Sequence, residues 1–366
     1  MTIVLNGTTG ITTPTTSSTG EFVTSVTGFK NRIINGAMVI AQRATSVTGA
    51  DVYCCVDRFD FSRNTIVWNA AQSTDVPSTT TFRYSTSVTV TTNSSAAGAY
   101  AYIYQAIEGY NWADLGYGTA SAQTSTLSFW VKSSLTGTFG IALRNATGSS
   151  RFFTTTYTIN TANTWEQKTI TITGDTAGTW NTTNGVGLGI FWDLGVGSTY
   201  SSTSNNAWST VASNFFGVTG AIKLGATNGA TFFITGVQLE KGSTATTFDY
   251  RPYGTELQLC QRYYEKSYNM ASIAGASTNT NKGSFVCATG NTFWRWTQNY
   301  RVSKRADSTF TIYSTTGASG NVRLNNASDL AVTTEDAGEN ATAIFVSRNA
   351  TVGDFFWWQW TASAEL

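Results

Sequence analysis

FFITGVQLEKGSTATTFDYRPYGTELQLCQRYYEKSY, residues 232–268, decides how this chain is organised. The first eight residues are largely apolar on both faces of a two-residue period, which predicts a strand packed on both sides. One face carries Phe233, Thr235, Val237 and Leu239, and the other carries Phe232, Ile234, Gly236 and Gln238. The strand closes one β-rich region, and the remainder of the stretch leads into another.

A helix is expected after this strand. Thr255 stands three residues before Gln258, as in a capping box, and the ring of Pro252 disfavours helix in the residue before it. An apolar stripe then runs along the helix at spacings of three and four: Leu257, Cys260 and Tyr264. Because two or three turns are not stable alone in water, the stripe must dock. Two alternatives are open: it packs on its own chain, or it meets copies of itself on a symmetry axis.

The composition is that of an all-β protein with little charge. The chain has 366 residues, more than a single core usually supports, so at least two domains are expected. Charged residues make up 12%, aromatic residues 13%, and 34 Gly stand against 3 Pro, which favours strands joined by tight turns. The net charge of +1 gives no electrostatic reason to expect nucleic acid or an anionic membrane as partner.

The residue inventory restricts the chemistry. The chain has no His, so Ser-His-Asp and Cys-His sites are excluded, and its 4 Cys form no CxxC pair. We expect free thiols, no metal, no cofactor and no enzymatic activity. A glycosidase would need a pair of carboxylates, and candidates exist. They are Asp57 with Asp60, Asp175 with Asp193, and Glu335 with Asp336 and Glu339, each of which is more typical of a turn or an ion pair.

Four segments follow from the patterns. Residues 1–28 are a Thr/Ser/Gly arm with few apolar positions, expected to lie as a strand against a partner or to be disordered. Residues 29–253 carry alternating strands, including LSFWVKSS and VDRFDFS, and predict a jelly-roll-like β-sandwich. Residues 254–268 form the linking helix, and residues 269–366 a smaller second β-sandwich. The N-terminus does not have the pattern of a signal peptide, and no membrane helix is expected, so we expect synthesis in the cytoplasm.

Several of these pieces resemble a family of phage tail-fibre and virion-surface proteins. The matching segments are NRIINGAMVIAQR with the following DRF, LSFWVKSS, TWEQKTITITGDTAGTW, the stretch 232–268 and the terminal WTASAEL; LNGTTGITTP resembles a virion-attachment arm. VSKRADSTF departs from the family pattern. The resemblance implies a homotrimeric virion protein that attaches to another virion protein through residues 1–28 and binds host-surface glycan with carbohydrate-binding-like sandwiches. A head or neck fibre without host recognition is the alternative, and a polysaccharide-degrading tailspike a more distant one.

The resemblance does not identify receptor-contacting residues, so glycan contacts are sought among the aromatic residues. Trp112, Trp180 and Trp208 stand in Gly/Asn/Thr-rich stretches, where a flat ring can stack on a sugar. The structural alternative is that these rings cover an end of the sandwich.

Overall fold

The computed structural model of the chain describes residues 4–6, 10–12, 29–78, 80–145, 151–204, 206–210, 215–287 and 291–366. In the arm, β1 (Val4–Asn6) pairs antiparallel with β2 (Gly10–Thr12). The rest of the arm expected over residues 1–28 lies outside the described residues. Among the described residues, no helix has the length and apolar character needed to cross a membrane.

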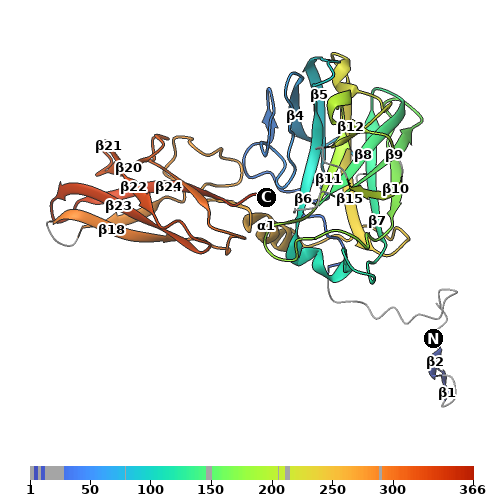
Figure 1. Cartoon of the computed structure of the whole chain (residues 1–366). Coiled ribbons are helices and arrows are strands. Elements are labelled where there is room, and N and C mark those ends of the chain that lie inside the picture. Colours follow the sequence, from blue (N-terminus) through green and yellow to red (C-terminus); the bar gives the residue numbers. More distant parts are fainter. Residues whose placement is uncertain are drawn as a thin grey trace.

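Two antiparallel sheets face each other in the N-terminal sandwich (Figure 1). The six-stranded sheet has the order β10 (Glu166–Ile172), β7 (Ser125–Ser133), β15 (Thr231–Lys241), β5 (Ser85–Thr92), β4 (Val67–Ser73), β3 (Ser46–Val47). The five-stranded sheet has the order β13 (Trp208–Thr210), β9 (Arg151–Ile159), β8 (Gly137–Arg144), β11 (Val186–Asp193), β6 (Tyr102–Glu108). The short strands β12 (Ser201–Ser202) and β14 (Gly217–Val218) pair in parallel beside it.

The C-terminal domain is a smaller β-structure built around β24 (Phe355–Ser363). β24 pairs with β16 (Tyr264–Lys266), β17 (Gly283–Val286), β19 (Thr309–Tyr313) and β20 (Asn321–Leu324), and β20 pairs with β21 (Ser328–Ala331). A second sheet has the order β18 (Asn291–Asn299), β23 (Ala341–Ala350), β22 (Thr333–Glu335). Trp294 and Ile344 from this sheet share a core with Phe356 and Trp360 from β24.

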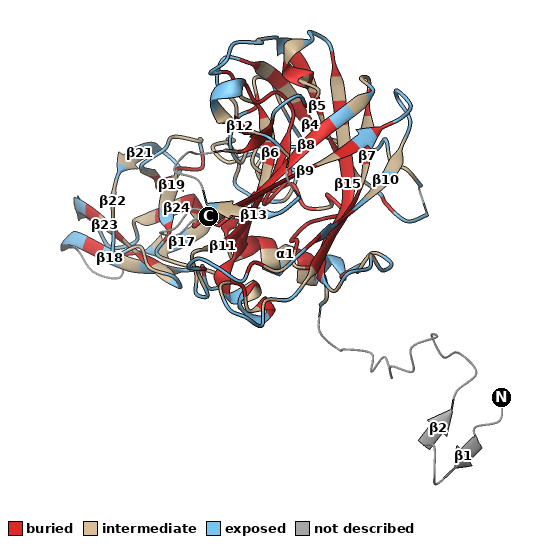
Figure 2. Ribbon diagram, turned by 45° about the vertical axis from the view of Figure 1, so that its right-hand side comes forward, coloured by how far each residue is buried: buried red, intermediate tan, exposed pale blue. Residues whose placement is uncertain are grey.

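The buried residues lie between the sheets, as the alternation predicts (Figure 2). In β7, Phe129 and Val131 are fully buried in the sandwich core, while Trp130 between them is half-buried on the outer face. The inward rings bury much of their apolar surface, and this is the main favourable term in the fold. The expected all-β class, with a sandwich, one short helix and a second smaller β-domain, is confirmed.

A β-bulge interrupts the alternation expected in β15. The register against β7 shifts between Thr235 and Gln238, and Gly236 takes a φ of 60°. Phe232 and Val237, which strict alternation would place on opposite faces, therefore both enter the sandwich core. The expected division of this strand into two faces holds only up to the bulge, because one extra residue reverses the parity of all later positions.

Two other local expectations are corrected. VDRFDFS, expected as a strand, makes only an isolated bridge between Asp60 and Tyr104. The linking helix α1 spans Tyr253–Gln261, with Pro252 rather than Thr255 at its N-cap and no side-chain capping bond. It ends earlier than residue 268 because the chain then enters β16, whose backbone pairs with β24.

The stripe Leu257, Cys260 and Tyr264 packs within its own chain. Cys260 is fully buried in a cluster with Ile34 and Ile40, Leu257 packs against this cluster, and Tyr264 lies in β16 with 7% of its surface exposed. Within the single chain Cys260 and Tyr264 are thus covered by the protein's own residues and Leu257 is half-buried, as in the first of the two alternatives. A trimer axis at this stripe stays a prediction.

The last residues of the chain fasten the two domains together, and the C-terminus lies beside α1 at their junction (Figure 1). Arg58, only 1% exposed, forms an ion pair with Glu365 and stacks on the ring of Tyr263, 3.6 Å from its centroid. The Tyr53 hydroxyl donates to the Leu366 carbonyl oxygen at 2.9 Å. From the second domain, Arg305 Nε donates to the Ala364 carbonyl oxygen at 2.6 Å.

Candidate functional site

A hollow of about 300 Å³ opens on the outer face of the six-stranded sheet. We call it the aromatic hollow, because four of its lining residues carry rings. Its lining consists of Pro77, Ser78, Thr81, Phe82, Trp130, Gln167, Thr246, Thr247, Phe248 and Tyr250. The rings therefore come from the loop between β4 and β5, from β7 and from the segment after β15.

The floor of the aromatic hollow is set by strand register. Trp130 lies opposite Gln167 of β10 on one side and Thr235 of β15 on the other. Directly opposed residues in an antiparallel pair point to the same face, so the Gln167 amide and the Trp130 ring lie next to each other. Gln167 is exposed and Trp130 half-buried, so both are accessible from solvent.

The bulge in β15 allows two rings to lie against the backbone. A Cβ atom added at Gly236 would stand 2.6 Å from Phe82 Cζ and 3.1 Å from Trp130 Cδ1. These separations are shorter than carbon–carbon contacts, so only glycine fits beneath the two rings. The bulge thus fixes both the strand parity and the position of the rings that line the hollow.

A chain of ring contacts extends the wall of the hollow toward solvent. Phe82 meets Phe248 edge to face at a centroid distance of 5.2 Å, and Phe248 meets Tyr250 in the same way at 5.7 Å. Phe82 is 3% exposed, whereas Tyr250 is 52% exposed. Burial raises the pKa of the Tyr250 hydroxyl above its ordinary value, so the group is protonated and able to donate near neutral pH.

An ion pair lies beside the hollow on the same outer face. Lys132 of β7 pairs with Asp75 and stands 4.4 Å from the centroid of Phe233, while Trp165 Nε1 donates to Asp75 at 2.9 Å. Burial alone would raise the pKa of Asp75, but the hydrogen bonds from Lys132 and Trp165 outweigh it and hold the pKa below its ordinary value. The pair is therefore charged on both sides and contributes no net charge to this face.

This arrangement suits a ligand that has both apolar and hydroxylated surfaces. Accessible ring faces bind C–H surfaces, while amide and hydroxyl groups orient the ligand, and such a combination is typical of small-molecule sites. Thr246 and Thr247 are exposed at the rim. Lys132 and Asp75 neutralise each other, so this pair does not favour a charged ligand.

The three tryptophans proposed from the sequence come together, although not in this hollow. Trp112, Trp180 and Trp208 surround Tyr117, at centroid distances of 4.8, 4.8 and 5.8 Å. Trp112 is 1% and Trp180 7% exposed, which favours the alternative that they cover an end of the sandwich. Trp208, in β13, is half-buried. Glycan contact by these residues stays a prediction.

Most of the carboxylates considered for glycoside hydrolysis have a structural partner among the described residues. Asp57 accepts from the Gln42 backbone N–H at 2.8 Å, and Asp175 binds Arg151 through two contacts, of 2.6 and 2.7 Å. Asp193 accepts from three backbone N–H groups, and burial raises its pKa to about 6. The pair Glu335 and Asp336 contacts Arg295, and Asp60 accepts from Ser62.

Trp130 is not among the residues predicted from the sequence to contact glycan, because those predictions were limited to tryptophans in loops. A signal for it is present in LSFWVKSS, where Trp130 shares its face with Lys132, and Phe129 shares the opposite face with Val131. A face that carries a lysine is seldom the core face. Phe82, Phe248 and Tyr250 lie in irregular segments, and no pattern in the sequence brings them to β7.

No family model and no curated protein matches the sequence. Among solved structures, the chain is similar to the enzymatically active domain of bacteriophage CBA120 tailspike protein 4, with 14% identity and a TM-score of 0.29 over 56% of this chain and 22% of that one. It is also similar to a putative sugar binding protein from Bacteroides thetaiotaomicron, with 14% identity and a TM-score of 0.32 over 58% of this chain and 100% of that one. A further similar structure is a family 11 carbohydrate-binding module from Clostridium thermocellum, with 10% identity and a TM-score of 0.28 over 55% of this chain and 98% of that one. These likenesses are distant and do not identify a ligand.

Proposed function

We propose that this chain binds carbohydrate through the aromatic hollow. The observation that carries the proposal is the convergence of Trp130, Phe248 and Tyr250 with the Gln167 amide and two threonines in one solvent-open hollow of about 300 Å³. A sugar ring has a C–H face for the aromatic rings and hydroxyl groups for the amide and threonine side chains. The absence of net charge at the neighbouring Lys132–Asp75 pair favours a neutral glycan.

The biological setting is proposed from the sequence resemblance. We place the chain in a phage virion as a tail fibre, with residues 1–28 bound to another virion protein and the aromatic hollow directed at host-surface glycan. Three copies are proposed to associate, through surfaces that do not include the buried side chain of Cys260. Light scattering of the full chain at micromolar concentration tests it, and a monomer contradicts it.

The glycan proposal is tested by titration of immobilised and soluble glycans with the purified full chain. Trp130→Ala removes the floor of the hollow and is expected to weaken binding at least tenfold, about 1.4 kcal/mol, because a stacked ring loses its partner. Phe293→Ala is the matched control, since Phe293 is 57% exposed but lies in the C-terminal domain. Equal binding by wild type and Trp130→Ala rules out the hollow as the site.

The proposed activity is binding without hydrolysis. The same titrations, followed for release of reducing sugar, test this directly. Release that disappears in Asp60→Asn or Asp175→Asn would replace the binding proposal with a polysaccharide-degrading one. Inhibition of host adsorption by the purified chain separates a receptor-binding fibre from a head or neck decoration.

A further inference from the structure

Two adjacent cysteines, Cys54 and Cys55, lie on a bent segment of the sandwich between β3 and β4. Val52, just before them, takes a φ of 46°, a conformation that branched side chains rarely adopt. A straight strand would direct two neighbouring side chains to opposite faces, but here the two thiols are hydrogen bonded to each other. The turned backbone thus brings two thiols into contact on consecutive residues.

The two thiols differ in exposure and in acidity. Cys55 is 1% exposed in the sandwich core, whereas Cys54 is half-buried and follows the exposed residues Asp51 and Val52. The hydrogen bond from Cys55 lowers the pKa of Cys54 against the opposing effect of burial, and the same bond together with burial raises the pKa of Cys55. Because the thiolate is the reactive form of cysteine, Cys54 is the thiol that reacts first.

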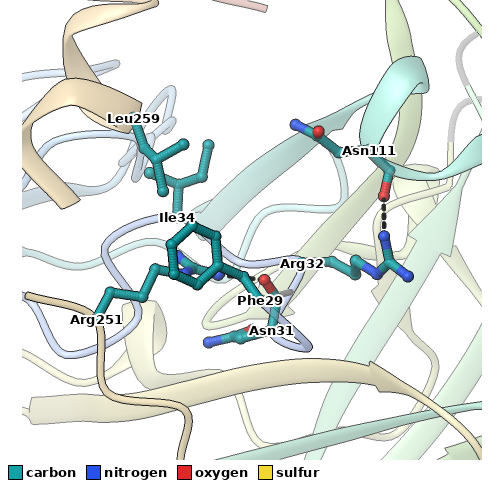
Figure 3. A pocket seen from close by; sticks show the side chains of 7 residues that line it. All are labelled: Phe29, Asn31, Arg32, Ile34, Asn111, Arg251 and Leu259. Carbon is teal, nitrogen blue, oxygen red and sulfur yellow. Dashed lines mark hydrogen bonds between the residues drawn. The ribbon is translucent and has the colours of Figure 1, made fainter. Parts of the chain in front are cut away.

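The other two cysteines lie in different clusters from this pair. Cys260 is fully buried in the cluster that contains Ile34. Ile34 and Leu259, which packs against the same cluster, lie side by side in the wall of a cavity of about 170 Å³ next to α1 (Figure 3). Cys287 is buried in the core of the C-terminal domain. All four cysteines of the chain are among the described residues and are free thiols, so the contact between neighbours is particular to Cys54.

The spacing of the pair indicates what kind of disulfide it can form. The peptide bond between the two cysteines is trans, which places their Cα atoms about 3.8 Å apart. Disulfides usually join Cα atoms that are about 4.4–6.8 Å apart, so a bond between these neighbours would be strained. Strained disulfides are readily reduced and are typical of exchangeable bonds, not of structural ones.

We propose that Cys54 and Cys55 form a reversible disulfide by exchange with a small neutral disulfide. The Cys54 thiolate attacks one sulfur of the reagent, whose S–S bond breaks and releases a thiolate that takes up the proton lost by Cys54. Cys55 then gives up its proton and attacks Cys54 Sγ, and the second thiolate leaves with that proton. Two cysteine thiols are oxidised to one disulfide while one small disulfide is reduced to two thiols. A neutral reagent suits the site because the Asp60 carboxylate acts electrostatically on Cys54.

The pair lies next to residues that hold the C-terminus. Tyr53, which precedes Cys54, donates to the Leu366 carbonyl oxygen at 2.9 Å, and Arg58 pairs with Glu365. A chain made in a reducing cytoplasm and released with a virion carries the pair first as thiols and afterwards meets an oxidising medium. This setting rests on the proposed function, whereas the exchange reaction does not.

The test incubates the native full chain with bis(2-hydroxyethyl) disulfide, blocks the remaining thiols with iodoacetamide and analyses a tryptic digest by mass spectrometry. Trypsin cleaves after Arg43 and Arg58, so both cysteines are released in one peptide, residues 44–58, which contains neither of the other two. We expect this peptide to lose two hydrogens and to carry neither iodoacetamide nor reagent. Excess 2-mercaptoethanol, added without denaturant, should restore both thiols.

Three variants test the order of the steps. In Cys55→Ser, Cys54 should keep the reagent as a mixed disulfide, because no second thiol displaces it. Cys55→Ala takes the place of this variant if far-UV circular dichroism shows that Cys55→Ser does not fold. In Cys54→Ser, the buried Cys55 should stay unmodified, and in Cys287→Ser, the matched control, the peptide 44–58 should react as in wild type.

Three outcomes contradict the proposal. Wild type that keeps the reagent on Cys54, or that does not react, shows that the two neighbours do not form a disulfide. Reaction of Cys55 at the wild-type rate in Cys54→Ser shows that Cys54 is not the attacking thiol. A disulfide that 2-mercaptoethanol leaves intact in the folded protein is not the reversible bond proposed.

Discussion

Gly236→Ala tests whether the bulge in β15 supports the aromatic hollow. Two costs can be worked from the structure. Alanine at a φ of 60° loses about 1–2 kcal/mol relative to an unstrained backbone. Its Cβ would also stand 2.6 Å from Phe82 Cζ, and because Phe82 is only 3% exposed its ring has little room to move. Overpacking of this kind costs about 1–3 kcal/mol, so we expect a total loss of about 2–5 kcal/mol.

Gly229→Ala is the matched control for the backbone term. Gly229 has a φ of 78°, similar to that of Gly236, but an added Cβ has no heavy atom within 4 Å. This variant should lose only about 1–2 kcal/mol. The difference between the two variants therefore measures the contact with Phe82 and Trp130.

Urea unfolding followed by tryptophan fluorescence gives the free energy of unfolding of each variant by linear extrapolation. Gly236→Ala should in addition weaken glycan binding, since the rings that line the hollow must shift. Equal losses in the two glycine variants would refute the reasoning. They would mean that the Phe82 ring moves away from the added Cβ at no cost, and that the bulge does not fix the positions of the rings in the hollow.

Three further predictions concern stability and are measured by the same unfolding experiment. Gly254→Ala, in the first turn of α1 with open space around the new Cβ, should stabilise the protein by about 0.5–1 kcal/mol. Glu365→Gln should cost about 3 kcal/mol because Arg58 is left buried without its countercharge, whereas Asp336→Asn, at an exposed pair, should cost less than about 0.5 kcal/mol. Burial raises the pKa of Asp60 from 3.8 to about 6, so the folded protein binds this proton more tightly than the unfolded chain does. The stability that this group contributes is fully present below pH ~4 and is lost as the pH rises through about 6. Asp60→Asn cannot titrate, so its free energy of unfolding should gain up to about 3 kcal/mol on that of wild type between pH 4 and 7. A difference in free energy of unfolding that stays constant over this pH range would contradict the prediction.

Most of the fold is predictable from the sequence because alternation marks a strand wherever one side is buried. LSFWVKSS illustrates this: Phe129 and Val131 enter the core and Trp130 and Lys132 do not. Alternation fails where the chain is held by other means. In VDRFDFS, Asp57 and Arg58 are both buried and polar, and their hydrogen bonds and ion pair run to Gln42 and Glu365 instead of along a strand ladder.

The candidate site was less predictable, because it depends on how segments distant in sequence meet. Gly236 could have been recognised as a bulge position, since an isolated glycine in a strand often marks one. Nothing local connects it with Phe82 or Phe248, which reach the hollow from irregular segments. The sequence left the surroundings of Cys260 open for the same reason, since Ile34 and Ile40, with which it packs, lie more than two hundred positions earlier.

The fastening of Ala364, Glu365 and Leu366 between the two domains has a mechanical consequence. These residues bond to the sandwich through Tyr53 and Arg58 and to the second domain through Arg305, so we expect little hinge motion at the junction. The two β-structures should then rotate as one body. If the sandwich binds glycan as proposed, that contact would also orient the C-terminal domain.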